Sequence, residues 1–283
     1  MSEKIALLTD STSDLGAEAI EKYGIKVLPL KVVYADRQYE DGIDITPEEV
    51  YATIDEENPK TSVPTPFEAQ QMLARLRDEG FTHVLAVHIS SGLSGTAEMV
   101  KMVSQDFKDL VVEVIDSRSL SMGLGYIILE AGRWLEKKMS FAQIVERARN
   151  LVDRSKVFFV VGTLEYLQRG GRIGRVSATL GEFLNVKPII SINKEGVYYT
   201  YKKIRGRRRS IDELFSIARE FIEKQKCRVA VMHGACPEEA AYLVKKVEEL
   251  ATVVELVTGP LGPVMGVHAG PGLLGLVICP CLD

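Results

Sequence analysis

Short apolar runs alternate along the first half of the chain with segments whose apolar residues recur at helical spacing. In the segment 95–107, for example, Met99, Val100, Val103 and Phe107 form one apolar stripe. Such alternation is typical of an α/β fold with a largely parallel sheet. The expected strands cover 4–9, 84–89 and 110–115, and the expected helices cover 66–79, 95–107, 122–138 and 141–154.

The pattern changes after Lys156. Two apolar runs, 186–192 and 197–204, flank the sequence Asn-Lys-Glu-Gly, which is typical of a hairpin turn. The chain is therefore predicted to form a parallel-sheet α/β domain over residues 1–155 and a mixed-sheet α/β domain over 156–283. No low-complexity linker separates the two, so we expect a permanent interface. The further strands expected in the second domain cover 157–161, 228–232, 252–257 and 273–278, and its helices cover 164–168, 211–225 and 237–250.

Composition narrows the class of protein. A length of 283 residues suits two domains, and 46% hydrophobic with 26% charged residues suits a globular protein with a large core. The net charge of −4 argues against a general affinity for nucleic acid. No cationic, apolar signal follows Met1, and no uncharged apolar run reaches the roughly 18 residues that a membrane helix needs. We therefore expect a cytoplasmic protein without stable membrane insertion.

Three clusters of hydroxyl side chains follow expected strands of the first domain, at 10–14, 90–96 and 116–121. Ligands of open α/β sheets bind outside the carboxyl ends of the strands. The middle cluster, Ser-Ser-Gly-Leu-Ser-Gly-Thr, precedes a helix whose N–H groups and dipole favour a phosphate or a carboxylate. A helix cap explains one hydroxyl, but this loop holds four. We predict an anion-binding loop that includes Ser94 and Gly95.

Ser94 also fits an enzymatic hypothesis. Its surroundings resemble the Gly-x-Ser-x-Gly turn of serine hydrolases, except that Thr96 replaces the last glycine. A triad would need a histidine and an acid, and His268 with Asp283 or Glu255 matches that requirement poorly. A serine hydrolase or a phosphotransferase that uses the loop stays the alternative. Sparse histidines and cysteines and the lack of a Walker or dinucleotide motif predict no metal and no cofactor.

Two further groups of residues are candidates for the same site. In the sequence Thr-Ser-Val-Pro-Thr-Pro, Thr65 and Pro66 suit the start of a helix, which leaves Thr61 and Ser62 for another role. His268 has glycines on both sides, which predicts a turn that lets a ligand approach the ring closely. We expect all three side chains to contact a ligand.

Positive charge is concentrated in two places. Arg172 lies in the compact sequence Gly-Gly-Arg-Ile-Gly, and six lysines and arginines, Arg205 among them, occur within 202–209. Such a run is usually a solvated face, but here it could contact an acidic partner or a phosphate. A nucleic-acid-binding module is the weakest reading, because no aromatic residues are interleaved with the charges.

These motifs together resemble the DegV family, the bacterial fatty acid-binding proteins whose better-known members are called FakB. The resemblance extends in order over essentially the whole chain. The matching segments are 10–14, 61–64, 89–96, 116–117, 121–123, 167–174, 187–189, 204–206 and 268–272.

The resemblance implies a two-domain DegV-type fold with a long-chain fatty acid in a buried tunnel between the domains. It implies that Ser62, with Thr61, Ser94 and His268, holds the carboxylate. It also implies that Arg172 and Arg205 line the approach to the head group. Members of the family present the acid to a separate ATP-dependent fatty acid kinase for phospholipid synthesis and are not catalysts themselves. The dense charge at 205–209 is our candidate for the kinase docking surface.

The physical chemistry of a buried fatty acid agrees with this hypothesis. A buried carboxylate needs several donors, and each buried methylene contributes about 0.8 kcal/mol. One departure concerns Ala97, Glu98 and Met99, where relatives are expected to have an aromatic residue and small residues. Chain length and saturation are therefore not carried over from the family.

Overall fold

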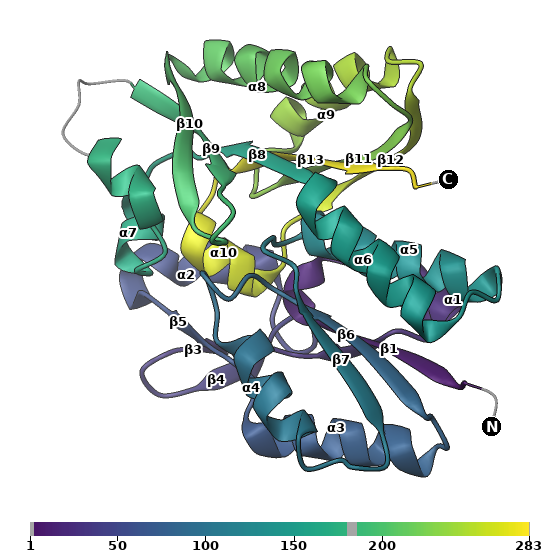
Figure 1. Ribbon diagram of the computed structural model, residues 1–283. Coiled ribbons are helices and arrows are strands. Elements are labelled where there is room, and N and C mark those ends of the chain that lie inside the picture. The colour runs from purple at the N-terminus through teal and green to yellow at the C-terminus, as the bar shows by residue number, and fades with distance from the viewer. Residues whose placement is uncertain (1–2, 180–185, 283) are drawn as a thin grey trace.

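The computed structural model describes residues 3–179 and 186–282. Helices and strands alternate as the apolar pattern predicts (Figure 1). The strands are β1 (Ile5–Asp10), β2 (Lys26–Leu28), β3 (Lys31–Val33), β4 (Gln38–Glu40), β5 (Lys60–Ser62), β6 (His83–His88), β7 (Val111–Asp116), β8 (Lys156–Val160), β9 (Val186–Ile192), β10 (Tyr198–Arg205), β11 (Cys227–His233), β12 (Val253–Pro260) and β13 (Leu274–Pro280). The helices are α1 (Ala17–Tyr23), α2 (Pro47–Glu57), α3 (Pro66–Asp78), α4 (Thr96–Ser104), α5 (Met122–Glu136), α6 (Phe141–Arg154), α7 (Glu165–Arg169), α8 (Arg207–Ile222), α9 (Pro237–Glu248) and α10 (Pro263–Ala269).

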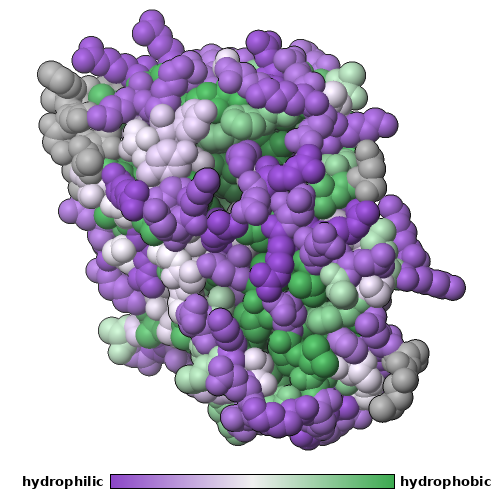
Figure 2. Space-filling model, in the orientation of Figure 1, coloured by the Kyte–Doolittle hydropathy of each residue, from purple (hydrophilic) through white to green (hydrophobic). Residues whose placement is uncertain are grey.

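The N-terminal sheet is parallel and has the order β2-β1-β6-β7. Its central strands, β1 and β6, are buried on both faces, because helices cover both sides. Leu8 and Val84 pack toward α3 and α4, whereas Leu7 and Leu85 pack toward α5. Figure 2 shows an apolar patch, bordered by polar residues, in the lower half of the visible face. On the edge strand β7, Val111 is 53% exposed.

The C-terminal sheet is mixed and has the order β10-β9-β8-β13-β11-β12. The pair β11–β12 is parallel, and the other neighbours are antiparallel. Helices α8 and α9 cover its outer face, and α5 and α6 lie between it and the parallel sheet (Figure 1). The prediction of a parallel sheet followed by a mixed sheet is confirmed. The last strand of the parallel sheet along the chain is β7, and the first strand of the mixed sheet is β8. The domain boundary near residue 155 stays a prediction.

A third sheet is antiparallel and has the order β4-β3-β5. It was not predicted, because strands of three residues are too short to show an alternation of apolar and polar residues. It packs against α10 and carries Thr61 and Ser62 on β5. The expected turn around His268 is wrong. Pro263 starts a helix that includes His268, and Gly270, with φ of 66°, ends it.

Two smaller predictions concern helix and hairpin ends. Thr65 caps α3 with Pro66 in its first turn, as expected, and β9 and β10 form the expected hairpin around Asn193–Gly196. Helix α8 begins at Arg207, four residues before the expected start. In the described part of the chain, no helix combines the length and the apolar character that crossing a bilayer requires.

Candidate ligand-binding site

One pocket lies where the small sheet, the parallel sheet and the C-terminal domain meet. It brings together five of the residues singled out from the sequence, which come from four distant segments. The volume of the cavity is about 40 Å3. The predicted residues that line it are Thr61, Ser62, Ser94, Arg172 and His268, and its other lining residues are Leu30, Val63, Ile89, Leu93, Tyr198, Val264 and Met265.

Thr61 and His268 meet across the pocket from different elements. The Oγ1 atom of Thr61 on β5 lies 2.7 Å from Nε2 of His268 on α10. The other ring nitrogen, Nδ1, is buried and has no hydrogen-bond partner among the described residues. It faces the backbone of Gly170 so closely that a Cβ there would lie 2.2 Å from Nδ1. Gly170 is therefore needed for the loop to cover this ring.

The charge state of His268 follows from its surroundings. Burial, with smaller effects of the positive charges of Arg172 and Lys60, lowers the pKa of His268 to about 4. The ring is therefore neutral at neutral pH and carries one proton. We assign that proton to Nε2, because an N–H at Nδ1 would be buried without an acceptor. His268 then donates to Thr61, and the Thr61 hydroxyl proton is free for another acceptor.

Most hydroxyls of the predicted anion loop are hydrogen-bonded to other groups of the protein. Ser90 Oγ donates to the Gly196 carbonyl at 2.8 Å, and Ser91 Oγ donates to Asp116 at 2.5 Å. Ser94 Oγ lies 2.9 Å from Thr96 Oγ1, and only Ser94 of the four lines the pocket. None of these hydroxyls caps the helix, because α4 begins at Thr96 and its cap residue, Gly95, has no side chain.

The other two hydroxyl-rich clusters support this loop. Asp10, at the end of β1, accepts hydrogen bonds from the backbone N–H of Ile89 at 2.9 Å and from His88 Nδ1 at 3.0 Å. Asp116, at the end of β7, accepts from the backbone N–H of Ser91 at 3.2 Å. Carboxylates at the ends of two strands therefore hold the loop that follows the strand between them.

Arg172 crosses from the C-terminal domain to the loop. Its Nε donates to the Leu93 carbonyl at 3.2 Å, and its Nη1 donates to the Gly170 carbonyl at 2.7 Å. The guanidinium is half-buried at the pocket wall. It is the charged side chain of the pocket lining, and it favours an anionic ligand.

The structure does not bring two predicted residues to the lining. Gly95 is exposed at the start of α4, next to Ser94. Arg205 is the last residue of β10, whereas Tyr198, the first residue of the same strand, lines the pocket. At about 3.3 Å per residue the strand places these two about 23 Å apart. Arg205 belongs to a separate surface with Lys203 and Arg209.

The described residues do not form the triad that the alternative hypothesis, a serine hydrolase, requires. His268 contacts Thr61, and its Nδ1 lacks an acidic partner in the described part of the chain. Glu255 is bonded to Arg133 and Arg228. Asp283 lies outside the described residues. Among the described residues, the Ser94 hydroxyl is hydrogen-bonded to Thr96 and not to a histidine that could activate it.

Two carboxylates that the sequence analysis did not select hold the start of α10. The backbone N–H of Gly262 donates to Asp14 at 2.9 Å, and that of Val264 donates to Asp41 at 2.8 Å. Both acids belong to the N-terminal half, so they fix α10 and its pocket residues against it. Burial raises the pKa of Asp14 to about 7, and the nearby Asp41 and Asp10 carboxylates add to the rise.

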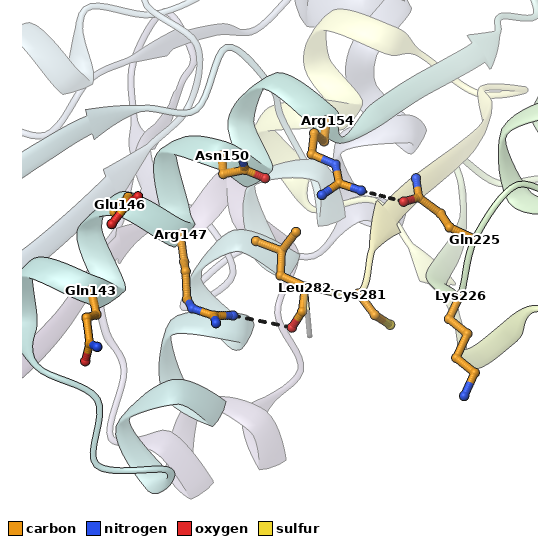
Figure 3. A pocket seen from close by; sticks show the side chains of 9 residues that line it. All are labelled: Gln143, Glu146, Arg147, Asn150, Arg154, Gln225, Lys226, Cys281 and Leu282. Atoms are coloured by element: carbon orange, nitrogen blue, oxygen red, sulfur yellow. Dashed lines mark hydrogen bonds between the residues drawn. The ribbon is translucent and has the colours of Figure 1, made fainter.

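A separate groove of about 600 Å3 lies between α6, the turn before β11 and the end of β13. Figure 3 shows that polar side chains line it, with Arg154 bonded to Gln225 and Arg147 to the Leu282 carbonyl. It contains none of the residues predicted for the site. Its open, polar walls suit solvent rather than an acyl chain.

Comparisons with known proteins point to one family. A family model described as an uncharacterised protein of the DegV family matches residues 4–281. A DegV domain-containing protein of Clostridium acetobutylicum is 46% identical over 276 residues, which cover 98% of this chain and 99% of the relative. One from Clostridium perfringens is 38% identical over 98% of both chains.

Solved structures agree in fold over the whole chain. A DegV family protein of Thermus thermophilus, whose structure is described as showing fatty acid binding, has a TM-score of 0.93 and 34% identity to this chain. The match covers 98% of this chain and 100% of the other. DegV of Bacillus subtilis, described as a fatty acid binding protein, has a TM-score of 0.91 and 29% identity, with 99% and 100% covered. A stearic acid-binding protein of Eubacterium ventriosum has a TM-score of 0.86 and 29% identity, with 98% of both chains covered.

Proposed function

Because this chain belongs to the DegV family, we propose that it binds a long-chain fatty acid with the carboxylate in the pocket between the two halves of the molecule. The observation that carries the proposal is the convergence of Thr61, Ser62, Ser94, Arg172 and His268 on that pocket. Relatives with the same fold are described as fatty acid binding.

The head-group end of the pocket supplies donors without a catalytic base. The hydroxyls of Thr61 and Ser94 and the guanidinium of Arg172 face one small space. Charge-assisted hydrogen bonds to a carboxylate are stronger than neutral ones, and several of them offset its desolvation. His268 contributes through Thr61, because its Nε2–H bond orients the threonine hydroxyl toward the ligand.

The acyl tail requires the apolar walls to move. A cavity of about 40 Å3 holds roughly three waters, at 10–15 Å3 each, which is enough for a carboxyl group but not for a long chain. The walls next to it are apolar, and Met265 is the most adaptable of them. We propose that the tail enters between the domains by displacing Met265 and its neighbours, and gains about 0.8 kcal/mol per buried methylene.

Binding of an acid and of its methyl ester separates head-group from tail contacts. The delipidated protein should bind palmitate more tightly than methyl palmitate in calorimetry. The double variant Ser94→Ala, His268→Ala should lose at least tenfold in affinity for the acid and little for the ester, since each lost hydrogen bond to a charged group is worth roughly 1.5–3 kcal/mol. Ser104→Ala, at a half-buried serine at the end of α4 that does not line the pocket, is the matched control.

Equal losses for acid and ester would contradict the head-group assignment. Turnover is not expected, because the Ser94 hydroxyl is bonded to Thr96 and to no histidine in the described part of the chain. Release of product from an ester by the isolated protein would support the hydrolase instead.

We further propose that the protein is a non-catalytic carrier in the cytoplasm that presents the bound acid to a separate ATP-dependent kinase. Ser62 is exposed at the pocket, which suits a head group reached from outside. The basic surface for docking includes the exposed Arg208 and Arg209, of which Arg208 lies 3.8 Å from Asp212. Arg207 is half-buried and bonded to Glu239. Charge reversal of Arg208 and Arg209 should reduce acyl phosphate formation with the cognate kinase.

The control for docking is charge reversal of Arg75 and Arg77, which are exposed on α3. Both variants should bind palmitate as the original protein does. Unchanged acyl phosphate formation after reversal of Arg208 and Arg209 would remove this surface from the proposal.

A further inference from the structure

The tip of the β9–β10 hairpin, residues Asn193–Gly196, docks against the loop that carries Ser94. Ser90 Oγ donates to the carbonyl of Gly196 at 2.8 Å, and the Gly92 N–H donates to Ser90 Oγ at 3.2 Å. Ser90 is fully buried, although it lies in an irregular loop. The contact joins the C-terminal sheet to the head-group loop of the N-terminal half.

The contact is so close that glycine is required on both sides. A Cβ on Gly92 would lie 2.6 Å from the carbonyl oxygen of Gly196. A Cβ on Gly196 would lie 2.0 Å from Ser90 Oγ, and Gly196 also has φ of 74°, which favours glycine. Any larger residue at 196 must therefore displace Ser90 or withdraw the tip.

Displacement of Ser90 would also move residues that line the pocket. The Ser90 carbonyl accepts hydrogen bonds from the backbone N–H groups of Leu93 at 2.9 Å and Ser94 at 3.0 Å. These two residues line the pocket, so Ser90 fixes their backbone. Two residues after the tip, Tyr198 forms another part of the pocket wall and packs edge-on against Phe159, with ring centroids 5.2 Å apart.

The tip is held in one conformation by its own contacts. Asn193 Oδ1 accepts from the backbone N–H groups of Glu195 and Val197, both at 3.0 Å. Arg118 donates to the Lys194 carbonyl at 3.4 Å. Because these contacts fix the tip, a change in its position would move the loop. A flexible tip would instead adjust to the position of the loop.

We propose that Gly196 and Ser90 are positioning residues, and that the hairpin tip sets the place of the Ser94 hydroxyl and backbone in the carboxylate site. The inference rests on the proposed function. Selectivity for an acid over its ester then depends on a hairpin of the other domain, although no residue of the tip contacts the carboxylate.

The test measures affinities for palmitate and methyl palmitate in three variants. Gly196→Ala should lower the ratio of acid to ester affinity by about tenfold, the worth of one displaced hydrogen bond to a charged group. Ser90→Ala removes the contact without adding atoms and should lower the ratio in the same direction. Gly24→Ala, at a glycine outside the hairpin that also has positive φ (61°) but no atom within 4 Å of an added Cβ, should leave it unchanged.

A double variant tests the route of the effect. If Gly196→Ala acts by displacing Ser90 Oγ, its effect on the ratio should be much smaller when Ser90 is already alanine. Additive effects of the two substitutions would overturn the route through Ser90.

The outcomes separate this inference from the proposed function. An original protein that binds acid and ester equally tightly refutes the head-group assignment, whatever the variants do. An original protein that selects the acid, with Gly196→Ala equally selective or equally weakened for both ligands, refutes the role of the hairpin alone. If Gly196→Ala does not fold, Ser90→Ala decides, and full selectivity in that variant overturns the inference.

Discussion

Burial keeps the imidazole of His268 neutral, and this limits what the residue can contribute to a carboxylate site. With a pKa of about 4, the ring offers a hydrogen bond and no charge between pH 6 and 8. Charge complementarity then comes from Arg172. The histidine orients Thr61, 2.7 Å away.

The pH dependence of binding distinguishes a neutral from a charged histidine. We expect the affinity for palmitate to change with pH between 6 and 8 by the same factor in the original protein and in His268→Gln, because His268 does not titrate there. The comparison cancels any ionisation of the ligand itself. Loss of affinity above pH 6.5 in the original protein alone would show that an imidazolium binds the carboxylate.

The same residues show what sequence could reveal about the site. Ser94 could be selected as one of several hydroxyls after a strand, Thr61 and Ser62 as hydroxyls that a helix start leaves unused, and His268 as a histidine among glycines. Leu30, Val264 and Met265 could not, because an apolar residue that lines a pocket is the same in sequence as one in the core. Arg205 was selected for local charge density, but charge density does not show that its strand leads away from the pocket.

At the scale of elements, α10 is held by the acids that accept from its first turn. Asp14 bonds the Gly262 N–H, and its pKa is raised from 3.8 to about 7 by burial, with a smaller effect of Asp41 and Asp10. The folded state therefore binds this proton more tightly than the unfolded state. The stabilisation is complete below pH 3.8 and is lost as the pH rises through 7.

Asp14→Asn should remove this pH dependence, since the amide oxygen still accepts from Gly262 and carries no titrating proton. Between pH 5 and pH 8 the free energy of unfolding should fall more in the original protein than in the variant. Urea unfolding at the two pH values measures both differences. Equal pH dependence in the two proteins would mean that Asp14 titrates normally in the folded state.

Long elements were predictable, and short ones were not. The expected helices at 66–79 and 141–154 lie within one residue of α3 and α6, because apolar spacing and capping residues agree there. Strands β3 and β5 have three residues each, too few to show alternation. Helix α10 was mistaken for a turn, because Gly266 and the glycines after it outweighed Pro263 as a start signal.

At the scale of the molecule, α5 is the element that both sheets share. It is buried along nearly its whole length, and the Tyr126 hydroxyl donates to the Val229 carbonyl of β11. Its Glu130, 4% exposed, pairs with Arg133 and with Arg228 of the C-terminal sheet. This network and the apolar core around α5 make the interface between the halves large.

Glu130→Gln should destabilise the protein by about 2 kcal/mol, because the half-buried guanidinium groups of Arg133 and Arg228 lose their bonds to that buried carboxylate and keep Glu255 as a partner. Urea unfolding followed by Trp134 fluorescence and by circular dichroism measures the loss, and the two signals should coincide in one transition. Glu113→Gln, in the exposed pair with Arg149, is the control and should cost about 0–1 kcal/mol. A similar small cost for Glu130→Gln would show that the network does not hold the halves together.

The central claim is that a fatty acid carboxylate lies between the halves of the molecule, at Thr61 and Ser94. A crystal structure of the delipidated protein reconstituted with a long-chain acid brominated at its terminal carbon tests it most directly. We expect carboxylate density within hydrogen-bond distance of Thr61 Oγ1 and Ser94 Oγ, and the bromine signal among apolar side chains between the domains, with Met265 displaced. A carboxylate bound elsewhere, as in the polar groove beside α6, or a bromine in solvent would contradict the claim.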